Sequence, residues 1–147
     1  MRYAFSAILG LALLGCSGAS PVAIQAGDKC ANCDRIVTEP RFGAELVGTD
    51  GQTAKFHSPG CLADYLTAYK GGIKNIFVTD YDSGKLFAVQ NALFVRDRID
   101  ENTGERDYLA FRSATAAGAY AREHSSDAVD WAAVRTLAAA AKNKKKK

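Results

Sequence analysis

Short hydrophobic runs separated by turn residues make up most of the chain. Residues 42–48 and 52–57 are two strand-like runs on either side of Asp50-Gly51. An Asp-Gly pair between apolar runs favours a hairpin, because glycine accepts the positive φ that a tight turn requires. We therefore expect two antiparallel strands here.

A helix is predicted directly after the second strand. Ser58 can cap it and Pro59 can occupy its first position, while Gly71-Gly72 provides a stop. Cys61 then lies in the first turn, where the amide dipoles favour a thiolate and should depress the thiol pKa.

Further runs predict strands at residues 73–79, 86–89 and 92–96. The polar stretch 97–106 is expected to be a loop. Residues 127–141 are expected to form a short strand or turn followed by a helix with core-facing Trp131, Val134 and Leu137.

The pattern of strand, serine and helix occurs twice. Residues 107–113 and the helix expected over 114–124 repeat residues 53–58 and the helix after them, at an offset of 55 positions. The matched pairs are Phe56 and Phe111, Ser58 and Ser113, and Tyr65 and Tyr120. This suggests an internal duplication, with chance similarity of two strand-helix units as the alternative. Because Arg112 and Ala116 stand where the first copy has His57 and Cys61, we expect chemistry in the first copy only.

The N-terminus has the features of a secretory signal. Met1-Arg2 precedes an apolar run too short to span a membrane, which ends at Leu13-Leu14-Gly15-Cys16. This ending resembles a bacterial lipobox, so Cys16 is interpreted as the lipid anchor; an ordinary signal with an incidental cysteine is the alternative. Ser17 after the cysteine favours the outer membrane.

These features predict a division of the chain. Residues 1–15 form a lipoprotein signal peptide, 16–27 a tether, 28–141 the folded domain with halves at about 28–80 and 86–141, and 142–147 a basic disordered tail.

The net charge of +3 depends on that tail, which contains five lysines. A solvated end explains it most simply, and attraction to anionic lipid is the alternative. No basic residues are interleaved with aromatic ones, so nucleic acid is not an expected partner.

With Cys16 set aside, Cys30, Cys33 and Cys61 remain. An odd number of thiols in an exported protein indicates a free, metal-bound or exchanging thiol. A thioredoxin-like pair would open a helix, whereas the residues after Cys33 are β-rich and end at Pro40, which disfavours thiol exchange.

Two metals fit the same residues. Cys30, Cys33, His57 and Cys61 could close a tetrahedral zinc site, or could hold Cu(I) by two or three thiolates with imidazole in support. Exposed soft ligands on an exported, tethered chain suit delivery of copper more than storage. His57 could instead be a capping or core histidine.

Other polar residues carry no catalytic pattern. His124 stands alone at a helix C-terminus, and Asp34, Asp64 and Asp107 are interpreted as solvated carboxylates. No Ser/His/Asp pattern, phosphate-binding glycine loop or paired acids appear, so we predict that the protein is not an enzyme.

The chain resembles the NosL family of lipoproteins. The resemblance rests on Cys30-x2-Cys33-x2-Ile36, on residues 40–46, on Asp50-Gly51 and on Lys55-Phe56-x-Ser58-x2-Cys61-Leu62-x2-Tyr65. It extends more loosely through residues 78–81 and 110–111 to the last helix, and the lipobox agrees with it.

Members of that family assist copper assembly of nitrous oxide reductase. The resemblance implies an α+β fold of two related ββαβ-like halves with a C-terminal helix. It also implies Cu(I) binding and a periplasmic copper enzyme or copper-transfer protein as partner, with the chain on a periplasm-facing membrane. Members commonly place a Met shortly after the second Cys, whereas this chain has only Met1 and places Asp34 and Arg35 there. Copper is then held by the three cysteines with His57, or the metal is zinc or another soft ion, or no metal binds.

Overall fold

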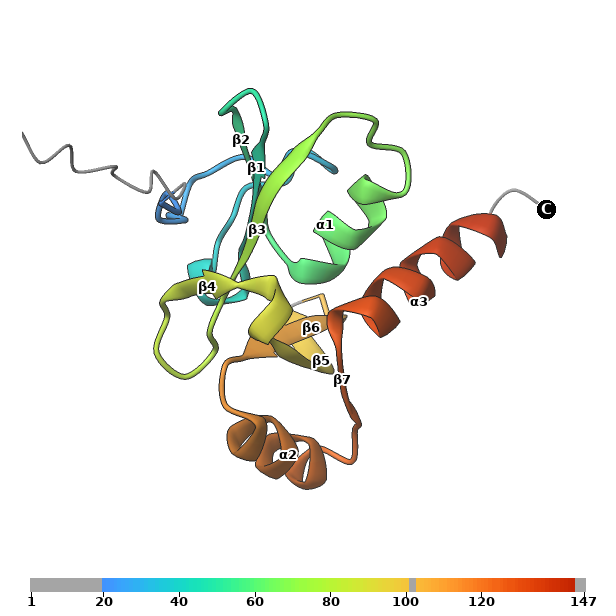
Figure 1. The fold of residues 1–147 in the computed structure, drawn as a ribbon. Coiled ribbons are helices and arrows are strands. Elements are labelled where there is room, and N and C mark those ends of the chain that lie inside the picture. The colour runs from blue at the N-terminus through green and yellow to red at the C-terminus, as the bar shows by residue number, and fades with distance from the viewer. Residues whose placement is uncertain (1–19, 101–102, 145–147) are drawn as a thin grey trace, which may run out of the picture.

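The first half of the chain forms a ββαβ unit with one added strand (Figure 1). The computed structural model describes residues 20–100 and 103–144. The unit consists of β1 (Ala44–Gly48), β2 (Thr53–Phe56), α1 (Pro59–Leu66), β3 (Ile73–Thr79) and β4 (Leu86–Ala88). Its antiparallel sheet has the order β2-β1-β3-β4. Short 3-10 helices at Pro40–Phe42 and Val89–Asn91 precede β1 and follow β4.

The second half repeats this topology. It consists of β5 (Leu93–Asp100), β6 (Glu105–Phe111), α2 (Ala114–Glu123), β7 (Ala128–Val129) and α3 (Trp131–Lys144), and its sheet has the order β6-β5-β7. In each half the first strand lies between the second and the third. The expected α+β fold of two ββαβ-like halves with a C-terminal helix is therefore confirmed.

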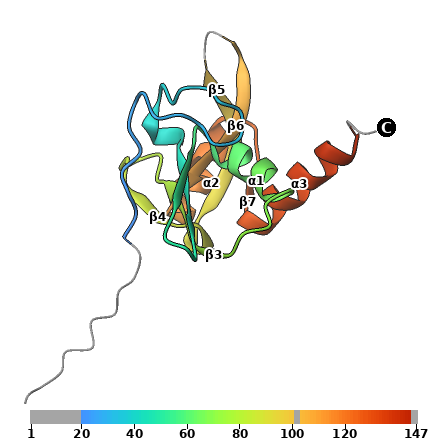
Figure 2. The same ribbon diagram turned by 90° about the horizontal axis from the view of Figure 1, so that it is seen from above.

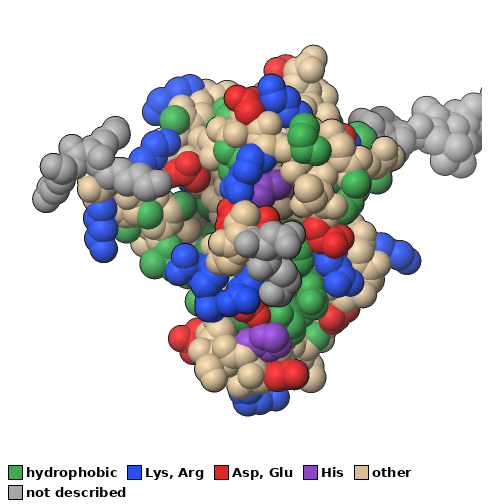
Figure 3. All heavy atoms as spheres, turned by 180° about the vertical axis from the view of Figure 1, so that it is seen from behind, with side chains coloured by type: hydrophobic (Ala, Val, Ile, Leu, Met, Phe, Trp, Pro, Cys, Tyr) green, Lys and Arg blue, Asp and Glu red, His purple; other side chains and the backbone are tan. Residues whose placement is uncertain are grey.

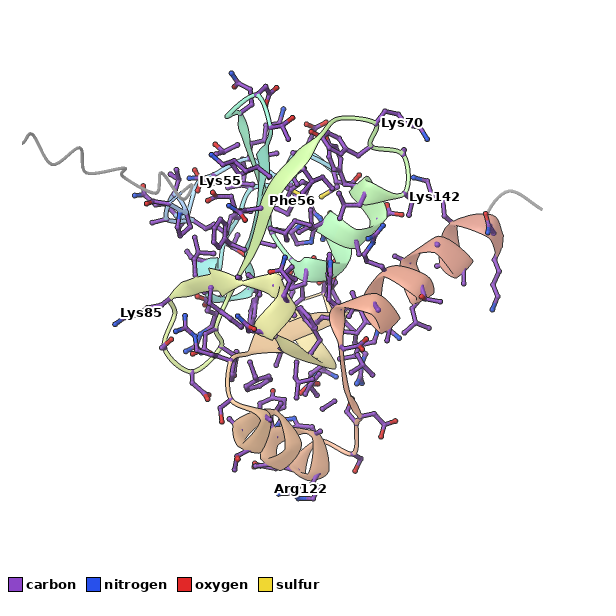
Figure 4. The ribbon with its side chains drawn as sticks, in the orientation of Figure 1. Lys55, Phe56, Lys70, Lys85, Arg122 and Lys142 are labelled. Atoms are coloured by element: carbon purple, nitrogen blue, oxygen red, sulfur yellow. The ribbon has the colours of Figure 1, made fainter. Side chains whose placement is uncertain are left out.

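The two faces of the first sheet are covered by different parts of the chain. Side chains alternate along β2, so Phe56 points into the core beneath α1 while Lys55 points to the other face (Figure 4). There Lys55 Nζ donates to the carbonyl oxygen of Ala23 at 2.9 Å, and the backbone N–H of Val22 donates to the buried Glu45 at 2.9 Å. Residues 22–28 thus lie against the sheet.

The second sheet separates two clusters of buried side chains (Figures 1 and 2). Phe94 packs with Trp131 and the core below α1, whereas its neighbour Val95 packs with Ala117 and Ala121 of α2. The sheet therefore has α2 on one face and α1 with α3 on the other. A parallel bridge between Asp80 and Ala110 also joins the two sheets.

The loop expected over residues 97–106 is wrong. β5 continues to Asp100 and β6 begins at Glu105, with the positive φ of Gly104 in the turn between them. The charged side chains of this ribbon have partners elsewhere in the fold. Asp97 accepts from the hydroxyl of Tyr120 on α2 at 2.9 Å, and Glu105 pairs with Arg35 in the loop before β1. Polar composition alone could not distinguish such a ribbon from a loop.

The helix ends also differ from the expectations. α1 ends at Leu66, before Gly71-Gly72, whereas α3 continues past Ala141 to Lys144. Lys142 extends from α3 toward α1 and donates to Thr67 Oγ1 at 2.7 Å (Figure 4). Within the described residues, none of the helices combines the length and the apolar character needed to cross a bilayer. The predicted signal peptide, the predicted anchor Cys16 and residues 145–147 lie outside the described residues.

Candidate metal centre

Four potential ligands that are separated in the sequence meet at one point. Cys30 and Cys33 come from the turn before β1, His57 from the end of β2, and Cys61 from the first turn of α1. Their ligand atoms all lie within 4.8 Å of one another. The structure thus brings together all four residues that the sequence predicts as ligands.

The Cys30–Cys33 pair lies on a short hairpin loop. Lys29 and Ile36 form a bridge, the N–H of Cys30 donates to the carbonyl of Arg35 at 2.8 Å, and Asp34 adopts a φ of +60°. The N–H of Ala31 donates to the carbonyl of Lys55 at 2.8 Å, which fixes this loop beside β2. The pair does not open a helix, unlike the pair of a thioredoxin-like site.

Residues of both halves fix Cys61. Its N–H donates to Ser58 Oγ at 3.1 Å, so Ser58 caps α1 as predicted. Asp107 of β6 accepts from Ser58 Oγ at 2.7 Å and from the N–H of Gly60 at 2.8 Å. Asp107 is therefore a buttress of the helix start, and its interpretation as a solvated carboxylate is wrong.

The distances fit a tetrahedral set of donors. The sulfur of Cys61 lies 3.5 Å from that of Cys30 and 3.7 Å from that of Cys33. His57 Nδ1 lies 3.3 Å from the sulfur of Cys30 and 3.5 Å from that of Cys33. A tetrahedral zinc ion with ordinary bond lengths has sulfur–sulfur edges of about 3.8 Å and sulfur–nitrogen edges of about 3.5 Å. These four donor–donor distances are therefore close to those of a tetrahedral site for a soft ion.

The centre opens to solvent on one side. Cys30 is fully buried and Cys61 is 9% exposed, whereas Cys33 is exposed. Figure 3 shows, from behind, a face on which two histidine side chains lie among charged side chains of both signs. A ligand can therefore approach the cluster through Cys33.

The two buried cysteines lie within hydrogen-bonding distance, with their sulfurs 3.5 Å apart. The hydrogen bond from the Cys61 thiol lowers the pKa of Cys30 well below its ordinary value, and His57 lowers it further. The same hydrogen bond, together with burial, raises the pKa of Cys61. The expectation that the helix dipole would depress the Cys61 pKa is therefore wrong, because the neighbouring Cys30 thiolate has the larger effect.

His57 links the cysteines to an ion pair between the halves. Its Nε2 lies 2.9 Å from Nη2 of Arg35 and 3.6 Å from Oε1 of Glu105. Arg35 donates both guanidinium Nη groups to Glu105 and approaches the sulfur of Cys33 at 3.5 Å through Nε. Burial lowers the pKa of His57, but the contacts with Cys30 and Glu105 outweigh burial, so that the pKa is raised.

The arrangement of His57 bears on how it can bind a metal. When Nε2 accepts from Arg35, the ring proton lies on Nδ1 and faces the sulfurs. A metal on Nδ1 requires that proton on Nε2 instead, where Glu105 is the carboxylate within reach.

Four residues at the centre were not predicted from the sequence. They are Asn32, Arg35, Glu105 and Asp107. Asn32 donates to the sulfur of Cys61 at 3.3 Å and to Asp64 at 3.2 Å, so Asp64 also has a partner and is not simply solvated. Asn32 and Arg35 could have been suspected from their places beside Cys33. For Glu105 and Asp107 the sequence holds no signal, because the contact depends on how the halves dock.

The remaining candidates do not form a second centre. The ligand atoms of His57, Glu105 and Asp107 lie close to one another. However, Glu105 is ion-paired with Arg35, and the Asp107 carboxylate already accepts three hydrogen bonds. His124 stacks on Tyr120 with ring centroids 3.9 Å apart and pairs with Asp97 at 2.7 Å. It lies at the C-cap of α2 and takes no part in the cysteine cluster.

Comparison with known proteins gives one result. A family model described as NosL matches residues 21–138, which include every residue of the centre. No curated protein and no solved structure matches the chain.

Proposed function

Since this chain belongs to the NosL family, we propose that it is a lipid-anchored accessory protein that binds Cu(I) and delivers it to a periplasmic copper enzyme. The family is accessory and non-catalytic, and its context is the maturation of nitrous oxide reductase. Nitrous oxide reductase is therefore the proposed recipient, and copper is cargo here.

The observation that carries the proposal is the group of three thiols and one imidazole around a single point. Thiolates select soft ions such as Cu(I), and imidazole is an acceptable fourth donor. Three cysteines with His57 give a full donor set without the thioethers that are common in the family.

The difference in burial between the cysteines suits transfer. Cys30 and Cys61 hold the ion from the buried side, and the exposed Cys33 is the ligand that an incoming donor can replace. Asp107 and Ser58 fix the helix start that carries Cys61, so the buried side stays in place while Cys33 exchanges. A protein that delivers a metal ion must both hold the ion and release it to the recipient.

Anchoring belongs to the same proposal. Lipidation of Cys16 would place the domain on a periplasm-facing membrane, with the outer membrane favoured by Ser17. The variant Cys16→Ser is expected to appear in the fraction released from membranes. Continued membrane association of this variant would instead implicate the basic tail.

The test of copper binding is a competition titration. Reduced protein beginning at Ser17 is titrated under argon against a Cu(I) chelator, as wild type and as Cys30→Ser and Cys33→Ser. Loss of a ligand should weaken binding at least a hundredfold, since even outer partners of a site contribute about 10–100-fold.

Histidine variants provide a matched control. His57→Asn should weaken Cu(I) binding, whereas His124→Asn should not, because His124 lies at the end of α2. Equal copper affinity in wild type and the Cys30→Ser/Cys33→Ser double variant would contradict the proposal.

A structural zinc site is the second candidate, because the observed edges fit a tetrahedron. A purely structural zinc ion couples binding to folding, so chelation would collapse the fold. We expect the thermal melt followed by circular dichroism to stay largely intact on chelation, because Cys30 and Cys61 are the only ligands in the first cluster of buried side chains and the second cluster contains none.

A further inference from the structure

Arg35 and Glu105 form a pair of opposite charges on the outer side of the metal centre. Arg35 is half-exposed and contacts the sulfur of Cys33 and the ring of His57. Glu105 comes from β6 of the other half and lies 3.6 Å from His57. No other described ion pair contacts the four ligands.

The charge of a bound ion determines how strongly it interacts with this pair. Coulomb energy is proportional to the product of the charges, so Arg35 repels a divalent ion twice as strongly as a monovalent one at the same place. Glu105 attracts both ions, again in the ratio of two to one. The guanidinium lies nearer the ligand atoms, since it contacts both Cys33 and His57, whereas Glu105 contacts only His57.

We propose that Arg35 and Glu105 set the preference of the centre for ion charge, with Arg35 favouring monovalent over divalent soft ions and Glu105 opposing it. This inference rests on the proposed function, because it concerns the same four ligands. It assigns a role to Arg35, one of the two residues in the region after Cys33 where family members commonly place a Met. The charged guanidinium supplies no bond to the ion and acts by excluding the wrong charge.

The test measures a ratio of affinities. Dissociation constants for Cu(I) and for Zn(II) are determined by chelator competition for the reduced wild-type chain beginning at Ser17 and for Arg35→Gln, Glu105→Gln and the double variant. Arg35→Gln should lower the preference for Cu(I) over Zn(II) by roughly tenfold, the size expected for one unit of charge near a partly screened centre. Glu105→Gln should raise that preference, and the double variant should lie between the two single variants.

Opposite signs distinguish this role from simple structural support. Loss of an ion pair that only held the halves together would weaken binding of both ions in both single variants. The same direction of change in the two variants, or no change in the ratio, would overturn the inference while leaving copper binding itself intact. A wild-type chain that binds no Cu(I) would overturn both this inference and the proposed function.

Two further variants complete the design. Arg35→Lys keeps the charge and should keep the preference for Cu(I). Arg41→Gln removes an exposed arginine that lies over the ring of Tyr81, away from the cysteines, and should leave the ratio unchanged. If Arg35→Gln does not fold, the direction of change in Glu105→Gln decides the question.

Discussion

The two halves share a frame but differ in what stands at the junction of the second strand and the helix. Ser58 caps α1 and Ser113 caps α2, and each accepts the amide three positions on, at 3.1 and 3.2 Å. The first half adds His57 and Cys61 at this junction, whereas the second has Arg112 and Ala116. The frame therefore provides positions for ligands but does not by itself make a metal centre.

The surroundings of the two junctions differ as well. Ser58 is fully buried, whereas Ser113 is exposed. The loop carrying Cys30 and Cys33 lies beside β2, and Asp107 of the second half reaches the start of α1. The second half therefore supports the metal centre of the first half. The two halves share one topology but have different roles.

The largest expected effect belongs to the centre of the first half, where copper binding should depend on pH. The raised pKa of Cys61 keeps this thiol protonated at neutral pH, so a metal must displace its proton. Copper affinity should then fall by at least about tenfold for each unit by which pH is lowered from 8 to 6, because each displaced proton contributes one factor of ten per unit. His57, whose pKa is also raised, steepens the fall at the acid end.

The measurement is a series of Cu(I) competition titrations at fixed ionic strength. Cys61→Ser should bind more weakly and lose the contribution of the Cys61 proton to the slope. Cys30, whose pKa is lowered, adds nothing to the slope in this range. A wild-type affinity independent of pH would show that no proton is displaced.

A smaller difference is expected in the stabilities of the two caps. Ser58→Ala removes an acceptor for the N–H of Cys61 and a donor to Asp107 in a buried place, and should lower the free energy of unfolding by about 2–3 kcal/mol. Ser113→Ala removes an exposed cap and should lower it by about 1 kcal/mol or less. Urea denaturation of the metal-free chain measures both values. Equal losses would mean that Asp107 contributes nothing through Ser58.

The fold could be predicted largely because its signals are local. The Asp50-Gly51 turn and the serine caps need only neighbouring residues, and the repeated pattern indicated two similar halves. The ribbon over residues 97–106 was missed since its charges find partners on α2 and on the loop before β1.

The centre could be predicted only as far as its ligands. Cysteine and histidine have few other uses at such spacing, so Cys30, Cys33, His57 and Cys61 were identifiable. Glu105 and Asp107 were not, because a carboxylate in a polar stretch acquires its role from the docking of β6 against α1.

The smallest expected effect comes from transferring the ligands of the first half to the second. The double variant Arg112→His/Ala116→Cys reproduces the spacing of His57 and Cys61 on the frame of α2. We expect it to bind no second ion, because Arg112 lies over the ring of Phe87 and the thiols of Cys30 and Cys33 lie beside His57 in the other half. Two donors without the paired thiolates leave a soft ion with an incomplete ligand set. Metal content of the reductively purified variant, measured by mass spectrometry against wild type after loading with one and with two equivalents of Cu(I), checks this result. A second ion held as tightly as the first would mean that the shared strand-helix topology is enough to make a metal centre. The loop that carries Cys30 and Cys33, and the support from Asp107, would then not be required.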